Sequence, residues 1–262
     1  MFDIHYHMLF GVDDGPKTIE ASVELAEASI AEGVTHVVCT PHSSDAYDFH
    51  PEVNSERLAM LNDRLGGRIT LGLGCDFHLT FDNIEDASRN KSKYTINGGR
   101  YLLVEFPEFG ISRFNSEVLF QFSSSGVIPI ITHPERNPEL LAKPNRMIEW
   151  LRSGCLIQLT AGSLIGRFGK RAQAMSIDLI KKNWVHVIAS DAHSMEWRPP
   201  AMALAYQFLD NRFGRDTADR LCIKNPRAIF FGNLLEPNPE PKGIYADEQP
   251  ESSFFSRFFR SK

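Results

Sequence analysis

The chain begins with MFDIHYHMLFGVDDGP (residues 1–16), a short apolar strand that carries two histidines and leads into two adjacent aspartates. Side chains alternate between the two faces of a β-strand, so His5 and His7 point in the same direction. Two imidazoles that converge on one point suit a metal ion, and Asp13 or Asp14 can return from the following loop to join them. An H-x-H pair alone is equally compatible with two exposed histidines before a turn, so the rest of the sequence must decide.

Downstream of this strand, the sequence alternates between helical and strand patterns. Apolar residues recur at helical spacing over residues 19–30, and Gly33 ends that helix. The run VTHVVCTPH (residues 34–42) is short and β-branched, which is typical of a strand buried on both faces. Similar strand patterns cover residues 69–77, 101–107, 127–136, 156–162 and 185–193, with helical stretches such as 145–153 and 171–183 between them. Seven strands that alternate with helices predict an α/β fold built as a parallel barrel.

Two regions of different composition divide the chain. Residues 1–235 are predicted to form the barrel as one domain. Residues 236–262 are rich in Pro, Glu and Ser and cannot supply a core, so we expect a disordered C-terminal tail. The tail ends in FFSRFFRSK, which we interpret as a loose end, with weak docking to a membrane or a partner as the alternative.

Composition argues against several classes of partner. The chain has 262 residues, of which 42% are hydrophobic, a formal net charge of −5 and a pI near 6.0. This charge gives no reason to expect nucleic acid or an anionic membrane as the main partner. The four cysteines form no C-x-x-C pair, the first strand leaves no room for a signal peptide, and no apolar run approaches membrane-spanning length. We therefore expect reduced thiols, no membrane insertion and a cytoplasmic location.

Six of the seven predicted strands end in residues that can bind a metal ion. In chain order these residues are His5 with His7, His42, Asp76, Glu105, His133, and Asp191 with His193. Barrel enzymes build their sites on this face from the ends of several strands, so we interpret the set as one metal site. His78 is a weaker candidate for the same face. We expect His36 and His186 to be structural and His50 to be exposed.

This set of ligands is too large for one ion. Mixed imidazole and carboxylate ligands fit Mn²⁺, Fe or Zn²⁺, and Glu105 is suited to bridge two metals. Clustered metals generate hydroxide from water at neutral pH and stabilise a displacement at phosphorus. Arg136 and Arg198 follow two of the histidines closely, and their guanidinium groups can bind phosphate oxygens in pairs. The cysteines lack the spacing to arginine of thiol-based phosphatases, and no G-x-x-x-x-G-K-[ST] loop is present.

The motifs DIHYH, VDDGP, CTPH, VEFP, THPER, SDAHS and RPP occur in an order that resembles the polymerase-and-histidinol-phosphatase (PHP) superfamily. Within it, the chain is similar to the bacterial capsule-type, manganese-dependent protein-tyrosine phosphatases, from residue 1 to about residue 235. The resemblance implies a distorted seven-stranded (β/α)7 barrel with three metal ions, and a metal-activated hydroxide that attacks phosphotyrosine. The ions implied are Mn²⁺, with Fe²⁺, Co²⁺ or Zn²⁺ as alternatives. The implied ligands are His5, His7, Asp14, His42, Glu105, His133, Asp191 and His193, and the implied catalytic, phosphate-binding residues are Arg136 and Arg198.

One position departs from the family pattern. Asp76 stands where the family typically has glutamate, and we expect it to remain a ligand if its strand sits closer to the metal. The resemblance also implies a partner, a tyrosine autokinase with a tyrosine-rich tail, in the control of capsule or exopolysaccharide synthesis. It leaves a homo-oligomer open.

Two other functions fit the same residues. A PHP-type phosphatase of a small phosphomonoester, such as histidinol phosphate, or of a nucleic-acid end would keep the fold and the metals. A preference for phosphopeptides separates the leading hypothesis from this one. The second alternative is a metal-loaded protein that binds a kinase tail without hydrolysing its phosphate ester. Only the substitution at Asp76 favours this hypothesis, which predicts phosphopeptide binding with no phosphate release.

Overall fold

Nine short strands form the centre of the part of the chain that the structure describes, residues 1–245. In this computed structural model the strands are β1 (Phe2–Tyr6), β2 (His36–Cys39), β3 (His42–Ser43), β4 (Thr70–Leu73), β5 (Asp76–His78), β6 (Tyr101–Glu105), β7 (Ile128–Ile131), β8 (Leu156–Thr160) and β9 (Val187–Ala189). Neighbouring strands are parallel, in the orders β1-β2-β4 and β3-β5-β6-β7-β8-β9. A parallel bridge between Tyr6 and Ala192 links the two ends of the curled sheet. The carboxyl ends of the strands therefore meet at one rim.

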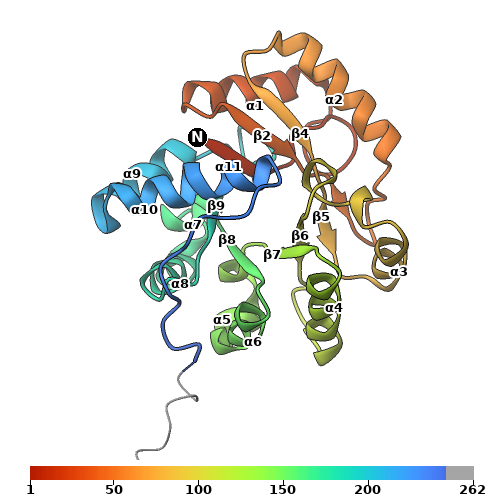
Figure 1. Cartoon of the computed structure of the whole chain (residues 1–262). Coiled ribbons are helices and arrows are strands. Elements are labelled where there is room, and N and C mark those ends of the chain that lie inside the picture. Colours follow the sequence, from red (N-terminus) through yellow and green to blue (C-terminus); the bar gives the residue numbers. More distant parts are fainter. Residues whose placement is uncertain (246–262) are drawn as a thin grey trace, which may run out of the picture.

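Helices lie around the outside of this sheet (Figure 1). They are α1 (Ile19–Ala31), α2 (Pro51–Leu65), α3 (Phe81–Arg89), α4 (Arg113–Ser124), α5 (Pro138–Ala142), α6 (Met147–Arg152), α7 (Ala161–Leu164), α8 (Gly169–Lys181), α9 (Met202–Phe213), α10 (Arg215–Asp219) and α11 (Asn225–Phe230). The helices predicted over residues 19–30, 145–153 and 171–183 are confirmed as α1, α6 and α8. Within residues 1–245, no helix is both long enough and apolar enough to cross a bilayer.

The α/β barrel architecture is confirmed, but two of the seven predicted strands are each divided in two. Residues 34–42 contain β2 and β3, and residues 69–77 contain β4 and the start of β5. The first break falls at Pro41, which has no N–H to continue the ladder. The second falls at Gly74, where an added Cβ would lie 3.1 Å from a methyl group of Val38. Beyond the breaks, His42 and Asp76 pair with each other in the second sheet.

Apolar side chains and α11 close the amino ends of the strands. Phe2, Tyr101 and Leu156 begin β1, β6 and β8, and all three belong to one buried apolar cluster. Phe230 of α11 packs against Phe2 with ring centroids 5.9 Å apart. The Tyr101 hydroxyl donates a hydrogen bond to the Asn233 carbonyl at 2.7 Å. Polar side chains therefore gather at the opposite end, where the strands finish.

Residues 236–245, which the sequence analysis assigns to the tail, contact the barrel at several points. Ile244 is buried, and the Lys242 carbonyl accepts a hydrogen bond from the Trp184 indole at 2.9 Å. The Arg152 guanidinium donates to the Ile244 carbonyl at 2.6 Å. One apolar side chain and a few backbone carbonyls are enough to anchor a segment that has no core of its own. The rest of the expected tail, 246–262, lies outside the described residues.

Candidate metal centre

The carboxyl ends of the strands bring all nine predicted metal ligands together. These residues are His5, His7, Asp14, His42, Asp76, Glu105, His133, Asp191 and His193. Together with His78 they form four overlapping groups, and within each group the ligand atoms lie within 4.8 Å of one another. Because the groups share several members, they form one continuous centre rather than four separate sites.

His5, in β1, and His7, just after it, face each other inside this centre. Their Nε2 atoms are 3.3 Å apart. On the far side of each ring, Nδ1 of His5 lies 3.0 Å from Oε1 of Gln158, and Nδ1 of His7 lies 2.8 Å from Oδ2 of Asp13. An amide or carboxylate oxygen accepts, so each Nδ1 donates and each Nε2 directs a lone pair into the centre. Without a metal ion a proton on one Nε2 can join the two rings, and a metal ion that replaces this proton meets a lone pair from each ring, so the pair fits a metal ion.

The two adjacent aspartates have different positions, which the residue pattern left open, whereas the family resemblance implied Asp14 as the ligand. The Asp14 carboxylate is half-exposed and lies 3.3 Å from Nε2 of His42 and 3.4 Å from Nε2 of His193, inside the centre. Asp13 is buried behind it and accepts a hydrogen bond from the Gly15 N–H at 2.9 Å. A Cβ at Gly15 would lie 2.4 Å from the backbone carbonyl oxygen of His7, so this tight turn requires glycine. Asp14 is therefore a candidate ligand, and Asp13 positions His7.

Asp76 reaches the centre although its side chain is shorter than glutamate. Its Oδ2 lies 3.1 Å from Nδ1 of His42 and 3.6 Å from Nε2 of His5. Both carboxylate oxygens are buried, and neither accepts a well-formed hydrogen bond from the described residues. A buried carboxylate without donors is unfavourable unless a cation compensates it. This residue therefore also fits a metal ion.

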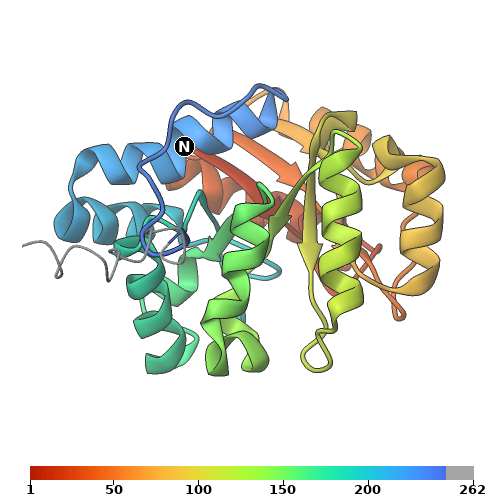
Figure 2. The ribbon, with the colours of Figure 1, turned by 60° about the horizontal axis from the view of Figure 1, so that its bottom comes forward.

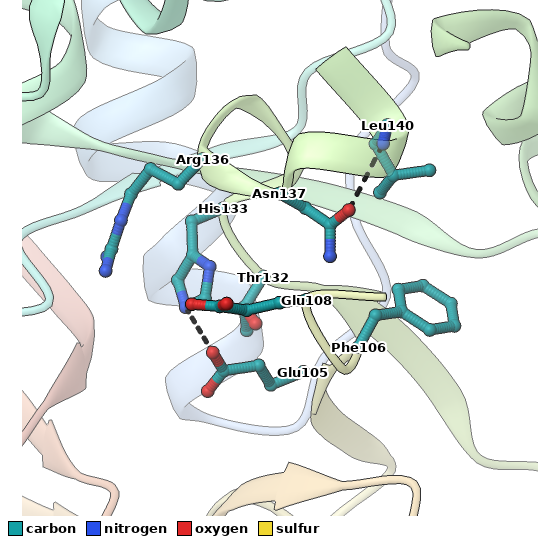
Figure 3. Close-up of a pocket in the computed structure, with 8 residues that line it drawn as sticks. All are labelled: Glu105, Phe106, Glu108, Thr132, His133, Arg136, Asn137 and Leu140. Atoms are coloured by element: carbon teal, nitrogen blue, oxygen red, sulfur yellow. Dashed lines mark hydrogen bonds and ion pairs between the residues drawn. The ribbon is translucent and has the colours of Figure 1, made fainter. Parts of the chain in front are cut away.

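His78 and Glu105 complete the side of the centre next to β5 and β6. Nε2 of His78 lies 3.0 Å from Oε2 of Glu105 and 3.3 Å from Nδ1 of His42. The other oxygen of Glu105 lies 3.8 Å from Nε2 of His133 (Figure 3). Glu105 thus extends one oxygen towards each of two histidines, the geometry of a bridging carboxylate. His78, a weak candidate from sequence, belongs to the cluster.

Two members of the centre have backbone angles that are rare for their residue types. His133 has φ of 31° and Asp191 has φ of 53°, both in the left-handed region that favours glycine. Such a conformation costs about 1–3 kcal/mol per residue and is concentrated at functional sites. The strain directs both side chains to a point shared with His5, since these three residues form one of the four ligand groups.

Both predicted phosphate-binding arginines contact the centre through Asp191. Arg136 and Arg198 each donate a hydrogen bond to Oδ2 of this carboxylate, at 3.0 Å for Arg198. Its Oδ1 lies 3.4 Å from Nε2 of His5. The Arg136 guanidinium also stacks 4.5 Å above the ring of Phe168. One carboxylate therefore connects the histidine cluster to two guanidinium groups.

The centre attracts positive charge. Burial alone lowers the pKa of His5, but the carboxylates of Asp76 and Asp191 outweigh it and raise the pKa to about 9. Burial likewise opposes the charge on His42, whose contacts with neighbouring carboxylates raise its pKa to about 11. At His133 burial dominates, and the pKa lies well below its usual value. The same carboxylates that hold protons on two imidazoles are available to divalent cations.

Comparisons with known proteins identify the family of the chain. The family model described as capsular polysaccharide synthesis, CpsB/CapC, matches residues 1–231. The chain belongs to the CpsB/CapC family. The resemblance to the capsule-type phosphatases is thereby confirmed.

Relatives of this CpsB/CapC protein cover most of its length. CapC of Staphylococcus aureus is 38% identical over 205 residues, 76% of this chain and 79% of its own. The tyrosine-protein phosphatase YwqE of Bacillus subtilis is 32% identical over 245 residues, 92% of this chain and 96% of its own. YwqE and CpsB from Streptococcus pneumoniae have crystal structures that describe them as metal-dependent tyrosine phosphatases. One of these structures matches this fold with a TM-score of 0.85 at 30% identity. That match covers 92% of this chain and 99% of the other.

Sequence reasoning missed two polar residues that support the centre. Gln158 is fully buried, and its Oε1 accepts a hydrogen bond from Nδ1 of His5. A glutamine inside the apolar strand LIQLT was the sequence feature that could have indicated this role. Glu135 is also fully buried, and its Oε1 accepts a hydrogen bond from the Thr160 N–H at 2.9 Å. This bond ties the turn that carries Arg136 to β8. No pattern in the sequence pointed to it.

The remaining histidines lie away from the centre. His36 stacks on Phe2 with ring centroids 4.2 Å apart, and His50 is exposed, as expected. His186 is buried just before β9, where its Nδ1 accepts a hydrogen bond from the Ile157 N–H at 3.1 Å. The structural role expected for His36 and His186 is confirmed.

Proposed function

We propose that this member of the CpsB/CapC family is a metal-dependent protein-tyrosine phosphatase. The activity named for YwqE and CpsB supports the assignment. The observation that carries it is the contact between the histidine–carboxylate centre and two arginines through Asp191. A multi-ligand metal centre with guanidinium groups at its edge suits a phosphorylated substrate.

The proposed ligands of three Mn²⁺ ions are the nine residues predicted from sequence, His5, His7, Asp14, His42, Asp76, Glu105, His133, Asp191 and His193, with His78 as an additional donor. Fe²⁺, Co²⁺ and Zn²⁺ are the alternative ions. The facing Nε2 atoms of His5 and His7 and the buried Asp76 carboxylate, which lies against His5 and His42, support this fit. When bound, such ions supply a water molecule that loses its proton near neutral pH, and they neutralise charge on the phosphoryl group.

Arg136 and Arg198 bind and orient the phosphate in this proposal. Each guanidinium group has five N–H donors, and Asp191 uses few of them. The donors left over can bind phosphoryl oxygens in the forked geometry that arginine favours. The ring of Phe168 under Arg136 and the hydrogen bonds to Asp191 limit the movement of both groups. The phosphorus atom is thereby held next to the ligand cluster.

We further propose that the phosphotyrosine belongs to the tail of a tyrosine autokinase that controls capsule or exopolysaccharide synthesis. The family description supports a role in capsular polysaccharide synthesis. We place this activity in the cytoplasm, because all four cysteines are buried and unpaired, as is usual in a reducing compartment.

Phosphate release from a phosphotyrosine peptide tests the proposed function. The protein is stripped of metal with a chelator, and Mn²⁺ is either added back or withheld. His133→Ala removes one ligand, and His50→Ala is the matched control, since His50 is exposed and outside the centre. We expect Mn²⁺ to restore activity to the wild type and to the control. The His133→Ala protein should lose more than about a hundredfold, because a lost ligand exceeds the 10- to 100-fold cost of losing a group behind one.

Two results would contradict the proposal in different ways. Release from histidinol phosphate or a free aryl phosphate, with none from peptides, would favour the small-phosphomonoester phosphatase. Binding of the phosphopeptide without release, in protein loaded with each of the four metals in turn, would favour the docking protein.

A further inference from the structure

The three most exposed large apolar side chains of the described residues lie on connections that follow members of the metal centre. They are Trp197, Phe81 and Phe109, which are 88%, 74% and 72% exposed. Each lies three or four residues after a member of the ligand cluster, namely His193, His78 and Glu105. Because those members lie at the carboxyl ends of the strands, the three aromatic residues lie on connections at the same end of the barrel as the centre.

Exposed rings of this size are unfavourable in water and mark an interaction surface when they gather around one site. Figure 2 shows the segment between β6 and α4, to which Phe109 belongs, projecting beyond the sheet at the lower edge of the view. Phe81 opens α3 directly after the loop from β5. Three separate connections thus each supply one aromatic side chain to the same end of the barrel.

The turn that carries Trp197 is held by its own hydrogen bonds. The Arg198 carbonyl accepts from the N–H of His193 at 2.9 Å and from the N–H of Ser194 at 3.3 Å. The Trp197 N–H donates to Oγ of Ser194 at 3.1 Å. The turn that places Arg198 on Asp191 therefore also fixes the backbone of Trp197, so little backbone freedom is lost when a ligand covers the exposed indole.

An acidic residue is adjacent in sequence to each of these aromatic residues. The acids are Asp82, Glu108 and Glu196; all three are exposed, and none forms an ion pair with another described residue. Asp82 also lies in the first turn of α3, where its negative charge interacts favourably with the helix dipole. Glu108 and Glu196 have no such role. Among the cations of nearby loops, Lys17 donates to the Asp13 carbonyl and Arg167 to the Pro199 carbonyl, whereas Arg113, four residues after Phe109, is exposed.

We infer that this aromatic–acidic rim, composed of Phe81, Asp82, Glu108, Phe109, Glu196 and Trp197, binds the polypeptide on both sides of the phosphotyrosine and prefers Lys or Arg there. The inference rests on the proposed phosphatase function and specifies its substrate. Cationic side chains are attracted by aromatic faces and by the neighbouring carboxylates. Arg136 and Arg198 repel such cations but are neutralised by the phosphate that they bind.

Steady-state kinetics of the full chain with Mn²⁺ test the rim. The substrates are two phosphotyrosyl peptides of equal length, with Lys or with Glu on both sides of the phosphotyrosine, and 4-nitrophenyl phosphate, which has no flanking residues. We expect the wild type to favour the Lys peptide about tenfold in kcat/KM. Trp197→Ala should lower the ratio of peptide to aryl-phosphate kcat/KM about tenfold, mainly through KM, and Trp197→Phe should recover part of it. Phe120→Ala, on α4 and 61% exposed, is the matched control and should stay within about twofold.

Fluorescence gives a second measurement that does not depend on turnover. Trp150 and Trp184 are buried, so acrylamide quenches mainly the emission of Trp197. A saturating, non-hydrolysable phosphonate version of the Lys peptide should protect that emission. Unchanged quenching, together with equal kinetics of the two peptides in the wild type and in Trp197→Ala, would overturn the rim while leaving the phosphatase function intact. Turnover of 4-nitrophenyl phosphate with neither peptide cleaved would instead refute the proposed function, and the rim with it.

Discussion

Asp13→Asn is expected to weaken metal binding although Asp13 is not itself a candidate ligand. Its carboxylate accepts from Nδ1 of His7 at 2.8 Å, from the Gly15 N–H at 2.9 Å and from the His42 N–H at 3.3 Å. An asparagine has one oxygen and one NH₂ group in place of the two oxygens. Whichever way the amide turns, its NH₂ group faces at least one of these N–H donors.

The size of the effect follows from the bond to His7. A hydrogen bond to a charged group contributes about 1.5–3 kcal/mol, and a neutral one about 1 kcal/mol. If the amide keeps its oxygen on His7, the bond is weaker and Nε2 is a poorer ligand. If the amide turns the other way, the proton moves to Nε2 and blocks it. Either arrangement should raise the dissociation constant for Mn²⁺ about 10- to 100-fold, the range typical of groups behind a metal ligand.

Calorimetric titration of the chelator-stripped protein with Mn²⁺ measures this constant directly. Asp48→Asn is the matched control, because the Asp48 side chain is exposed and outside the centre. Thermal unfolding without metal shows whether each variant is folded. If folded Asp13→Asn protein binds Mn²⁺ as tightly as the control, the idea that Asp13 sets the protonation of His7 is wrong.

Two further predictions concern stability. Ile244→Ala should lower the free energy of unfolding by about 2 kcal/mol, because Ile244 is buried against the barrel. Tyr245→Ala, at the exposed neighbouring residue, should lower it by less than about 0.5 kcal/mol. Equal effects of the two substitutions in chemical denaturation would mean that residues 236–245 add no packing. Burial lowers the pKa of His186 to about 4, so between its unfolded value of 6.5 and pH 4 the unfolded chain binds the extra proton. His186 should therefore reduce stability by about 3 kcal/mol as the pH falls from 6.5 to 4. The difference in unfolding free energy between the metal-free wild type and His186→Gln should show this slope, and parallel curves would refute it.

Local patterns in the sequence were enough to predict the architecture and the membership of the centre. The alternation of β-branched runs with helical periodicity is a property of neighbouring residues, and parallel strands joined by helices place their carboxyl ends on one face. For that reason eight ligand candidates, from His5 to His193, could be grouped although they are far apart in the chain, and the family resemblance added Asp14. The same reasoning placed Arg136 and Arg198 at this face, where both contact Asp191.

Tertiary structure decided which polar side chain does what inside that face. Residue pattern alone does not distinguish Asp13 from Asp14, for which the family resemblance was needed, but the turn at Gly15 sends Asp13 behind His7 and Asp14 towards His42 and His193. Gln158 lies 153 positions from His5 and touches it because β8 and β1 curl around the same centre. His78 joins the cluster through His42, 36 positions away, and Ile244 anchors its segment through Arg152, 92 positions away. Periodicity determines the face on which a side chain lies. Its partner on that face depends on where strands break and how the chain turns, because these features decide which distant residues come within contact distance.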